Sequence, residues 1–348
     1  MSGIRIEQRH TLGDWSTRWD ELVAAATKPS PFLRSWWIDN MACEQRIIIG
    51  VLIADELVGG IALDRRQVLG GPLFAMIGSG PLAPDHVDAV AHPAHGSVVV
   101  DTLRSWIRTQ SGAVFDLQGL PAHSLAAAIV QGVGTSYQHA VAPFARLPQD
   151  ATRYLASLPG QTRSTITRCS KRLAKAGYAM RVVSPVDASD ALERLANLHD
   201  SRWGQGSAVS GNWDLLRPAL LEGARLGDVM IHELATAEGQ VIASELDFVV
   251  GSQMSFYQAG RLTDRDYRGS GSVLRYAIIA AAIDRKVTEF DLLRGDEPYK
   301  AEWANASRPL MRLRRGVGLR GAAIATALNT NYLLAAKGPA VASKFRRA

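Results

Sequence analysis

The sequence has few cysteines and no long apolar run. Its two cysteines among 348 residues, Cys43 and Cys169, cannot build a disulfide framework and have no metal-ligand spacing, so no metal site is expected. No stretch approaches the roughly 20 apolar residues that are needed to span a membrane. The first residues also lack the apolar segment of a signal peptide. These absences predict a cytoplasmic protein.

The overall composition is that of an ordinary globular protein. Hydrophobic residues make up 47% of the chain and charged residues 21%, which excludes collagen-like, disordered and coiled-coil classes. At roughly 150 residues per domain, a chain of this length is expected to form two domains, each with its own core.

Acidic residues are absent from two long segments. Residues 152–181 contain seven basic groups and no acid, and residues 308–348 contain nine basic groups and no acid. Such segments attract the phosphates of nucleic acid, of acidic lipid or of a phosphorylated cofactor. The alternative is a solvated helix face and a loose tail. For the basic tail, peripheral contact with a membrane surface is one candidate role, and packing on the domain is the other.

The sequence contains an internal repeat. Residues 96–117 begin with Gly-Ser-Val and end with Phe-Asp-Leu, and residues 271–292 do the same. An apolar pattern of helical length lies between the two ends of each copy. Each copy therefore predicts a helix that is followed by a buried strand.

Each copy is preceded by a predicted hairpin and a further strand. The hairpins are expected at 47–63 and 229–250, and the further strands at 73–77 and 253–259. The chain is thus predicted to be an α/β protein with two copies of one domain, in which mixed twisted sheets are flanked by helices. Pro143 and Pro148 indicate a linker between them. The expected boundaries are 1–147 for the first domain, 148–320 for the second and 321–348 for a basic helix and tail.

A glycine-rich turn is expected after the strand at 253–259, at the start of an apolar helix. It consists of Arg268-Gly269-Ser270-Gly271-Ser272, and Arg265 precedes it. The free N–H groups of a helix's first turn bind anions, which makes this a candidate phosphate site. An ordinary helix cap by a serine is the alternative. A dinucleotide fingerprint is not supported, because Leu274 replaces its third glycine and Asp291 is expected inside a strand.

A second polar segment extends from Asp291 through Tyr299 and Lys300 to Trp303. Together with the run from Pro31 to Trp37, the arginine-rich segment and the glycine-rich turn, it resembles the GNAT superfamily. More narrowly, it is similar to the CelD-like and FemAB-like proteins, which are built from tandem GNAT domains. The resemblance extends to about residue 315 and is most specific over 291–303.

The resemblance implies two tandem GNAT-fold domains and an acyltransferase that uses acetyl-CoA or another acyl-CoA as co-substrate. In GNAT domains the donor lies between a splayed strand and the following helix. The first domain lacks a comparable loop at 94–97 and is expected to be a degenerate copy that supports a catalytic second domain. By position, the expected donor-binding residues are Phe256, Tyr257 and Gln258 beside the pantetheine, and Arg268, Gly269, Ser270, Gly271 and Ser272 at the phosphates.

Acyl transfer requires a base, a donor for the oxyanion and an acid for the leaving group. Glu245 and Asp247 are expected on one face of the strand at 241–250. One of them, with Glu245 preferred, is the candidate base, and a solvent-facing acid is the alternative. Tyr299 is a candidate acid. By resemblance, Lys300 stabilises the charge that develops on the transferred acyl group. Asp291 is a candidate for orienting the substrate or Lys300, and a structural buried pair is the alternative.

The predicted reaction moves an acyl group, with acetyl expected, to the amine or hydroxyl of a small molecule. A sugar or glycan precursor is a candidate acceptor. One alternative is a FemAB-like peptidyltransferase that uses aminoacyl-tRNA, although residues 151–181 offer a single short basic helix rather than a long hairpin. Another is a non-catalytic protein that binds phosphate or nucleic acid. No stable nucleic-acid partner is expected, because few aromatic residues lie among the arginines.

Overall fold

The computed structural model describes residues 3–80, 82, 84–204, 207 and 209–330. Strands within these residues form one mixed sheet of 13 strands. They are β1 (Ile4–Arg9), β2 (Arg46–Ile53), β3 (Glu56–Val68), β4 (Gly71–Met76), β5 (Val90–Ala91), β6 (Val114–Pro121), β7 (Val133–Arg146), β8 (Ala179–Val182), β9 (Val229–Ala235), β10 (Val241–Val250), β11 (Gln253–Arg261), β12 (Glu289–Asp291) and β13 (Ala306–Gly316). The named α-helices are α1 (Ser16–Ala24), α2 (Ser35–Asn40), α3 (Gly96–Thr109), α4 (Leu125–Ile129), α5 (Ala151–Ser157), α6 (Gly160–Lys175), α7 (Ala188–Trp203), α8 (Trp213–Leu226), α9 (Ser270–Asp284) and α10 (Pro298–Ala301).

The two halves of the chain repeat one arrangement of elements. In each half a hairpin and a third strand are followed by a helix and then by a strand parallel to the third one. Thus β4 pairs in parallel with β6, and β11 pairs in parallel with β12. The predicted repeat, its hairpins and the α/β class are confirmed.

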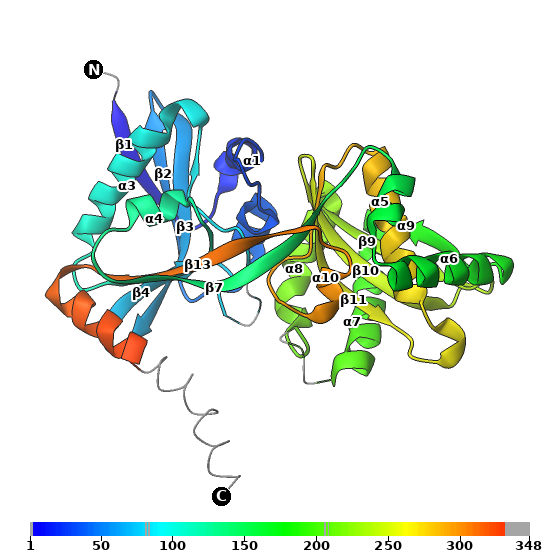
Figure 1. The fold of residues 1–348 in the computed structure, drawn as a ribbon. Coiled ribbons are helices and arrows are strands. Elements are labelled where there is room, and N and C mark those ends of the chain that lie inside the picture. The colour runs from blue at the N-terminus through cyan, green and yellow to red at the C-terminus, as the bar shows by residue number, and fades with distance from the viewer. Residues whose placement is uncertain (1–2, 81, 83, 205–206, 208, 331–348) are drawn as a thin grey trace, which may run out of the picture.

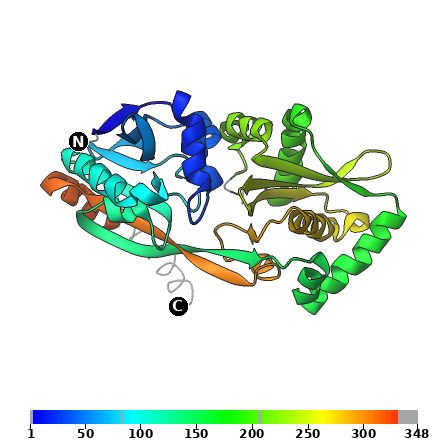
Figure 2. The same cartoon turned by 90° about the horizontal axis from the view of Figure 1, so that it is seen from above.

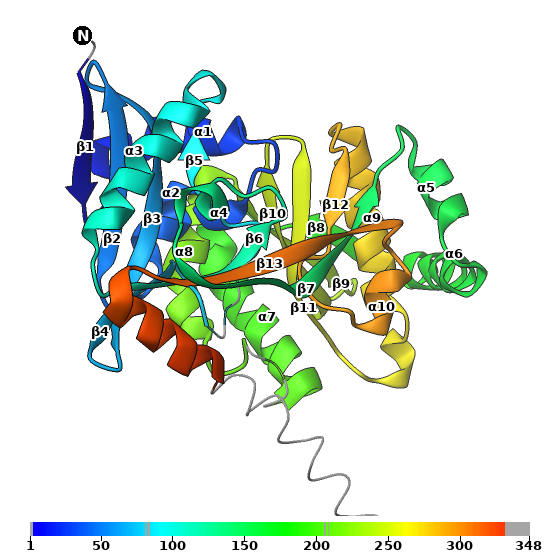
Figure 3. The ribbon, with the colours of Figure 1, turned by 60° about the vertical axis from the view of Figure 1, so that its left-hand side comes forward.

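Two long strands join the halves (Figures 1 and 3). β13 pairs with β7 along its whole length and with β6 from Leu310 to Gly316. The sheet order is β1-β2-β3-β4-β6-β13-β7-β12-β11-β10-β9-β8, with β5 beside β3. The last strand of the second half therefore lies within the sheet of the first half, and the domain boundaries at 147 and 320 stay predictions.

Local chemistry explains several element ends. The β2–β3 hairpin turns at Ala54 and Asp55, whose φ angles of 49° and 68° suit a tight turn between twisted strands. α6 and α8 are each followed by a glycine in the left-handed conformation, Gly177 and Gly227. β12 ends at Asp291, whose carboxylate accepts a hydrogen bond from the next-but-one backbone N–H. The prediction that Asp291 lies inside a strand is therefore wrong.

Helices cover both faces of the second half of the sheet (Figure 2). α9 packs on β9, β10 and β11 from one face, and α7 packs on β10 and β11 from the other, beside α8. α6 lies against α9 at the outer edge of the molecule. This arrangement places the basic helix next to the glycine-rich turn.

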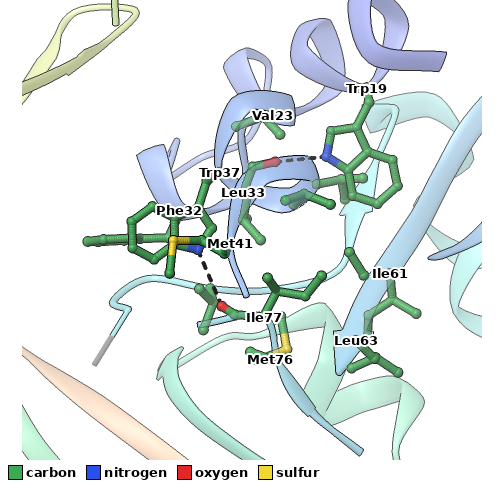
Figure 4. Packing of buried hydrophobic residues seen from close by; sticks show 14 of the residues in the cluster. Trp19, Val23, Phe32, Leu33, Trp37, Met41, Ile61, Leu63, Met76 and Ile77 are labelled. Carbon is green, nitrogen blue, oxygen red and sulfur yellow. Dashed lines mark hydrogen bonds between the residues drawn. The ribbon is translucent and has the colours of Figure 1, made fainter. Parts of the chain in front are cut away.

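The aromatic run near the start of the chain is buried between the halves. Trp19 donates its indole N–H to the carbonyl of Leu33 at 2.8 Å, and Trp37 donates to Ile77 at 3.3 Å (Figure 4). Phe32 meets Phe248 of β10, with ring centroids 5.5 Å apart. The run from Pro31 to Trp37 thus ties the first half to the second.

Residues 318–330 are helical, and Ile324 and Ala325 pack on Val114 of β6. This supports packing on the domain for the described part of the predicted C-terminal helix. The rest of the basic tail, 331–348, with its predicted membrane contact, lies outside the described residues. None of the described helices has the length and hydropathy needed to cross a membrane.

Candidate functional site

The sheet opens between β11 and β12. β11 pairs with β12 only from Gln253 to Ser255, and from there to Arg261 it is paired with β10 but no longer with β12. On its other edge, Phe256 and Gln258 pair with two consecutive residues of β10. Tyr257, which lies between them, is therefore an extra residue in the strand. Such a bulge bends a strand. The end of β11 thus diverges from β12, and α9 follows it.

The turn before α9 is packed closely beneath α6. Gly269 has a φ of +85°, and a Cβ atom there would lie 2.5 Å from the Sγ of Cys169. Arg172 also donates a hydrogen bond to the carbonyl of Arg268 at 2.6 Å. Ser270 is fully buried, and its Oγ has no hydrogen-bond partner among the described residues. A residue with a side chain at position 269 would therefore displace the helix.

A cavity of about 810 Å³ lies between α6 and this turn. One wall is a stripe along α6, and the other is formed by the end of β11, the following loop and the start of α9. The cavity is lined by Gln161, Ser164, Thr165, Arg168, Cys169 and Arg172 from α6, and by Arg261, Arg265, Asp266, Arg268, Gly269, Gly271 and Ser272 from the opposite wall.

The charge of this cavity is strongly positive. Five arginines and one aspartate line it. Among the described residues none of the five guanidinium groups forms an ion pair, although two of them donate to backbone carbonyls. Unpaired like charges repel one another, and a phosphate relieves this repulsion through charge-assisted hydrogen bonds. The cavity is therefore a candidate site for a multiply phosphorylated ligand.

A second, narrower cavity of about 180 Å³ adjoins the first. The two share Arg261, Gly271 and Ser272 as lining residues. Small residues, including Ala243, Ala259 and Gly260, line part of it. Its other lining residues are Ser244, Glu245, Leu274, Arg275, Tyr299, Glu302 and Trp303.

Glu245 and Arg275 form a buried ion pair at this second cavity. Arg275 Nη2 lies 3.0 Å from Glu245 Oε2, and Arg275 Nε also donates to the carboxylate. The side chain of Glu245 is buried, not solvent-facing. Burial outweighs the attraction of Arg275 and, with Asp247 nearby, raises the pKa of Glu245 to about 7. A carboxyl group with such a pKa can take up a proton at neutral pH.

Tyr299 also lies near Arg275. Its half-buried ring lines the second cavity, with its centroid 5.6 Å from Arg275 Cζ. The cavity therefore brings together two of the four predicted catalytic residues, Glu245 and Tyr299.

Lys300 is buried and lines neither of the two cavities. Its ammonium group donates to the carbonyl of Arg294 and lies 3.0 Å from Glu297 Oε2. Arg294 in turn donates its backbone N–H to Asp85 of the first half at 2.6 Å. Lys300 thus holds the turn between β12 and α10, and the first half holds the same turn from outside.

Asp291 is buried in an ionic cluster between the halves. Its Oδ2 lies 2.8 Å from Lys28 Nζ and 3.0 Å from His86 Nε2. Burial alone would raise its pKa, but His86 and Lys28 hold the pKa of this carboxyl far below its usual range. Within the described ranges no three His, Cys, Asp or Glu side chains are grouped to hold a metal ion.

The predicted donor-binding residues separate into two groups. Arg268, Gly269, Gly271 and Ser272 line the cationic cavity, whereas the buried Ser270 does not. The three strand residues line neither cavity. Phe256 lies under the Arg275 guanidinium at 4.0 Å, Tyr257 is buried against Phe32 and Phe248, and Gln258 is half-buried at the bulge.

Two features of the site were missed from the sequence. Arg275 is a single charge in the middle of an otherwise apolar helix, which is a pattern that indicates a buried partner. The lining stripe of α6 has the spacing of one helix face, as Gln161, Thr165, Arg168 and Arg172 show. That spacing could be found in the sequence, but the turn that it faces could not.

Residues 160–301 match the family described as acetyltransferase (GNAT) domain. This segment contains α6, the glycine-rich turn and Glu245, and the match supports acyl transfer as its chemistry. Similar solved structures include a crystal structure of FemX, with a TM-score of 0.62, 10% identity and coverage of 88% of this chain and 96% of that one. Another is the C-terminal domain (DUF2156) of a putative lysylphosphatidylglycerol synthetase from Agrobacterium fabrum, with a TM-score of 0.57, 13% identity and coverage of 93% and 98%.

At sequence identities this low, similarity to a solved structure shows a similar fold and nothing more. The predicted resemblance to GNAT and FemAB-like proteins and the tandem GNAT-fold architecture are confirmed at that level. A comparison with curated proteins gives no match.

Proposed function

We propose that this chain is a GNAT-type acyltransferase whose donor is acyl-CoA, with acetyl-CoA as the expected compound. One observation carries the proposal: a cationic cavity at the start of α9 adjoins a narrow cavity that contains Glu245, Arg275 and Tyr299. A phosphorylated donor with a thin reactive arm fits such a pair of cavities. The GNAT match over 160–301 supports the reaction class.

In this proposal the donor enters from the cationic cavity. Its diphosphate is held by Arg268 and by the backbone of residues 269–272 at the start of α9. The pantetheine arm then follows the end of β11 into the narrow cavity, which Ala259 and Gly260 line just beyond the predicted residues 256–258.

In the proposed reaction Glu245 and Tyr299 have different roles. The acceptor nitrogen or oxygen attacks the acyl carbon, and its proton passes to the Glu245 carboxylate, directly or through water. The C–S bond then breaks, and Tyr299 donates a proton to the leaving thiolate.

Lys300 and Asp291 act as positioning residues, because they hold the turn that leads to Tyr299. The acceptor is an amine or a hydroxyl, and we propose a sugar or glycan precursor.

A second candidate function is acyl transfer from aminoacyl-tRNA. It is favoured by the exposed basic surface of α5 and α6 outside the cavity, where Arg153, Arg163, Lys171 and Lys175 lie. The FemX-like fold is compatible with this candidate. Comparing the binding of CoA compounds with the binding of RNA distinguishes the two candidates.

Thermal unfolding of the purified protein is the first test. A ligand at ~100 times its dissociation constant adds roughly 2.7 kcal/mol, which should raise the melting temperature by a few degrees. Acetyl-CoA and CoA are expected to stabilise the protein, whereas NADH and a short RNA duplex are not. Stabilisation by the RNA alone would favour the tRNA-dependent candidate, and stabilisation by none of them would contradict both.

A pair of glycine variants tests the position of the site. Gly271→Val places a branched side chain in the wall shared by the two cavities, so acetyl-CoA binding should weaken by at least ~tenfold, equivalent to about 1.4 kcal/mol. The matched control is Gly96→Val, at the equivalent position of the first half, where a Cβ meets no atom of the described chain within 4 Å. Calorimetric titration measures both affinities. Equal loss in the two variants would show that the site is misplaced.

A further inference from the structure

The cationic cavity has two separate basic walls. Arg261, Arg265 and Arg268 lie on the wall next to the start of α9, and Arg168 and Arg172 lie on α6. The α6 arginines are seven and eleven residues after Gln161, so they belong to one face of the helix. A diphosphate at the start of α9 lies next to the first three arginines, whereas the two on α6 form the other wall, from which Arg172 also donates to the carbonyl of Arg268.

We propose that the α6 wall binds a second phosphate group of the same donor, namely a terminal phosphomonoester such as the 3′-phosphate of coenzyme A. This inference rests on the proposed function, because it assigns a second subsite within that donor site.

Charge supports a second phosphate. Five arginines and Asp266 give the cavity a net charge of +4. A diphosphate diester neutralises only about half of this, and a phosphomonoester adds roughly −1.5 to −2 at pH 7. The fork geometry of arginine also suits the several oxygens of a terminal phosphate better than lysine does.

The size of the cationic cavity also supports a second phosphate group. A volume of about 810 Å³ is far larger than a diphosphate needs and lies within the range of pockets that enclose a nucleotide-sized ligand. Arg168 has no hydrogen bond within the described part of the chain, so its guanidinium is available to a ligand. Arg172 keeps further N–H donors beside the one that contacts the turn.

Two donors that differ only in this phosphate test the proposal. Calorimetric titration at one fixed ionic strength compares acetyl-CoA with 3′-dephospho-acetyl-CoA. The wild type should bind the dephospho compound about tenfold more weakly or worse, which is the size expected for lost hydrogen bonds to a charged group. In Arg168→Gln/Arg172→Gln, acetyl-CoA should bind as weakly as the dephospho compound does.

The matched control removes two charges from the same helix outside the cavity. Lys171→Gln/Lys175→Gln should keep the full preference for acetyl-CoA, since both lysines are exposed and do not line the cavity. Arg168→Gln alone should lose most of the preference without disturbing the contact of Arg172 with the turn. Melting temperatures identify any variant that fails to fold.

The outcomes are distinguishable. Equal affinity of the wild type for the two compounds, or a preference that survives in both arginine variants, would overturn the second subsite while leaving acyl-CoA as the donor. Failure of the wild type to bind either compound would refute the proposed function and this inference with it.

Discussion

Glu245 lies beneath α9, where burial and a paired cation act on it in opposite directions. Burial raises its pKa from the ordinary value of 4.5 to about 7 despite Arg275. A raised carboxyl pKa means that the folded state favours the protonated form. The contribution of Glu245 to stability is therefore largest below pH 4.5 and is lost as the pH rises through about 7. The same titration creates the proposed base.

The first prediction is a pH dependence of turnover. The value of kcat/KM should rise with pH, with an inflection at about 7, as Glu245 loses its proton. Glu245→Gln should reduce turnover by roughly 100-fold or more and abolish the inflection. Glu302→Gln is the control, because Glu302 lines the same cavity but is exposed and retains its contact with Thr162 as an amide. An unchanged pH profile in Glu245→Gln would assign the base elsewhere.

At the scale of elements, the site depends on the contact of α6 with the turn before α9. Gly269→Ala should destabilise the protein by about 1–2 kcal/mol from the left-handed backbone alone, and by more because Cβ meets Cys169. Cys169→Ala removes the nearest atom, so the double variant should lose less than the sum of the single losses. Urea unfolding of the four proteins measures this coupling. Strict additivity would show that the helix does not pack on the turn.

The elements themselves could be predicted to a large extent from the sequence. The hairpins follow from apolar runs that are separated by turn residues, and the helix–strand repeat follows from the matching residues near 96 and 271. The end of β12 could not be predicted, because Phe-Asp-Leu-Leu continues the pattern of a buried strand. Only the folded chain shows that the Asp291 carboxylate binds the backbone and ends the strand.

The site was harder to predict because it is made by tertiary contacts. Arg168 and Arg268 are 100 residues apart, and no periodicity links them. The same holds for Glu245 and Arg275, which meet across the α9–β10 contact. Local patterns showed that a basic helix and a glycine-rich turn exist, whereas their shared cavity depends on how α6 packs against α9.

At the scale of the whole molecule, buried charges join the two halves beside β7 and β13. Lys28 and His86 of the first half both contact Asp291 of the second. Lys28 also contacts Glu289 at 2.6 Å, and Arg308 of β13 approaches Asp291 to 3.9 Å. This cluster lies directly before the turn that leads to α10, which carries Tyr299 and Lys300, so the first half supports this candidate catalytic segment as well as the sheet.

Asp291→Asn is predicted to destabilise the whole molecule. Removing one partner of a buried ionic cluster leaves uncompensated charge, so the free energy of unfolding at pH 7 should fall by about 3–5 kcal/mol. Because the pKa of Asp291 is lowered in the folded state, its stabilising effect is present above its ordinary pKa of 3.8 and is lost as the pH falls below that value. The variant should therefore lose stability less steeply than the wild type on acidification. Urea unfolding at neutral and acidic pH measures both effects.

Asp296→Asn, at an exposed position of the same turn, is the control and should change stability by no more than about 0.5 kcal/mol. Equal stability of the two variants would mean that the halves are held together without this cluster.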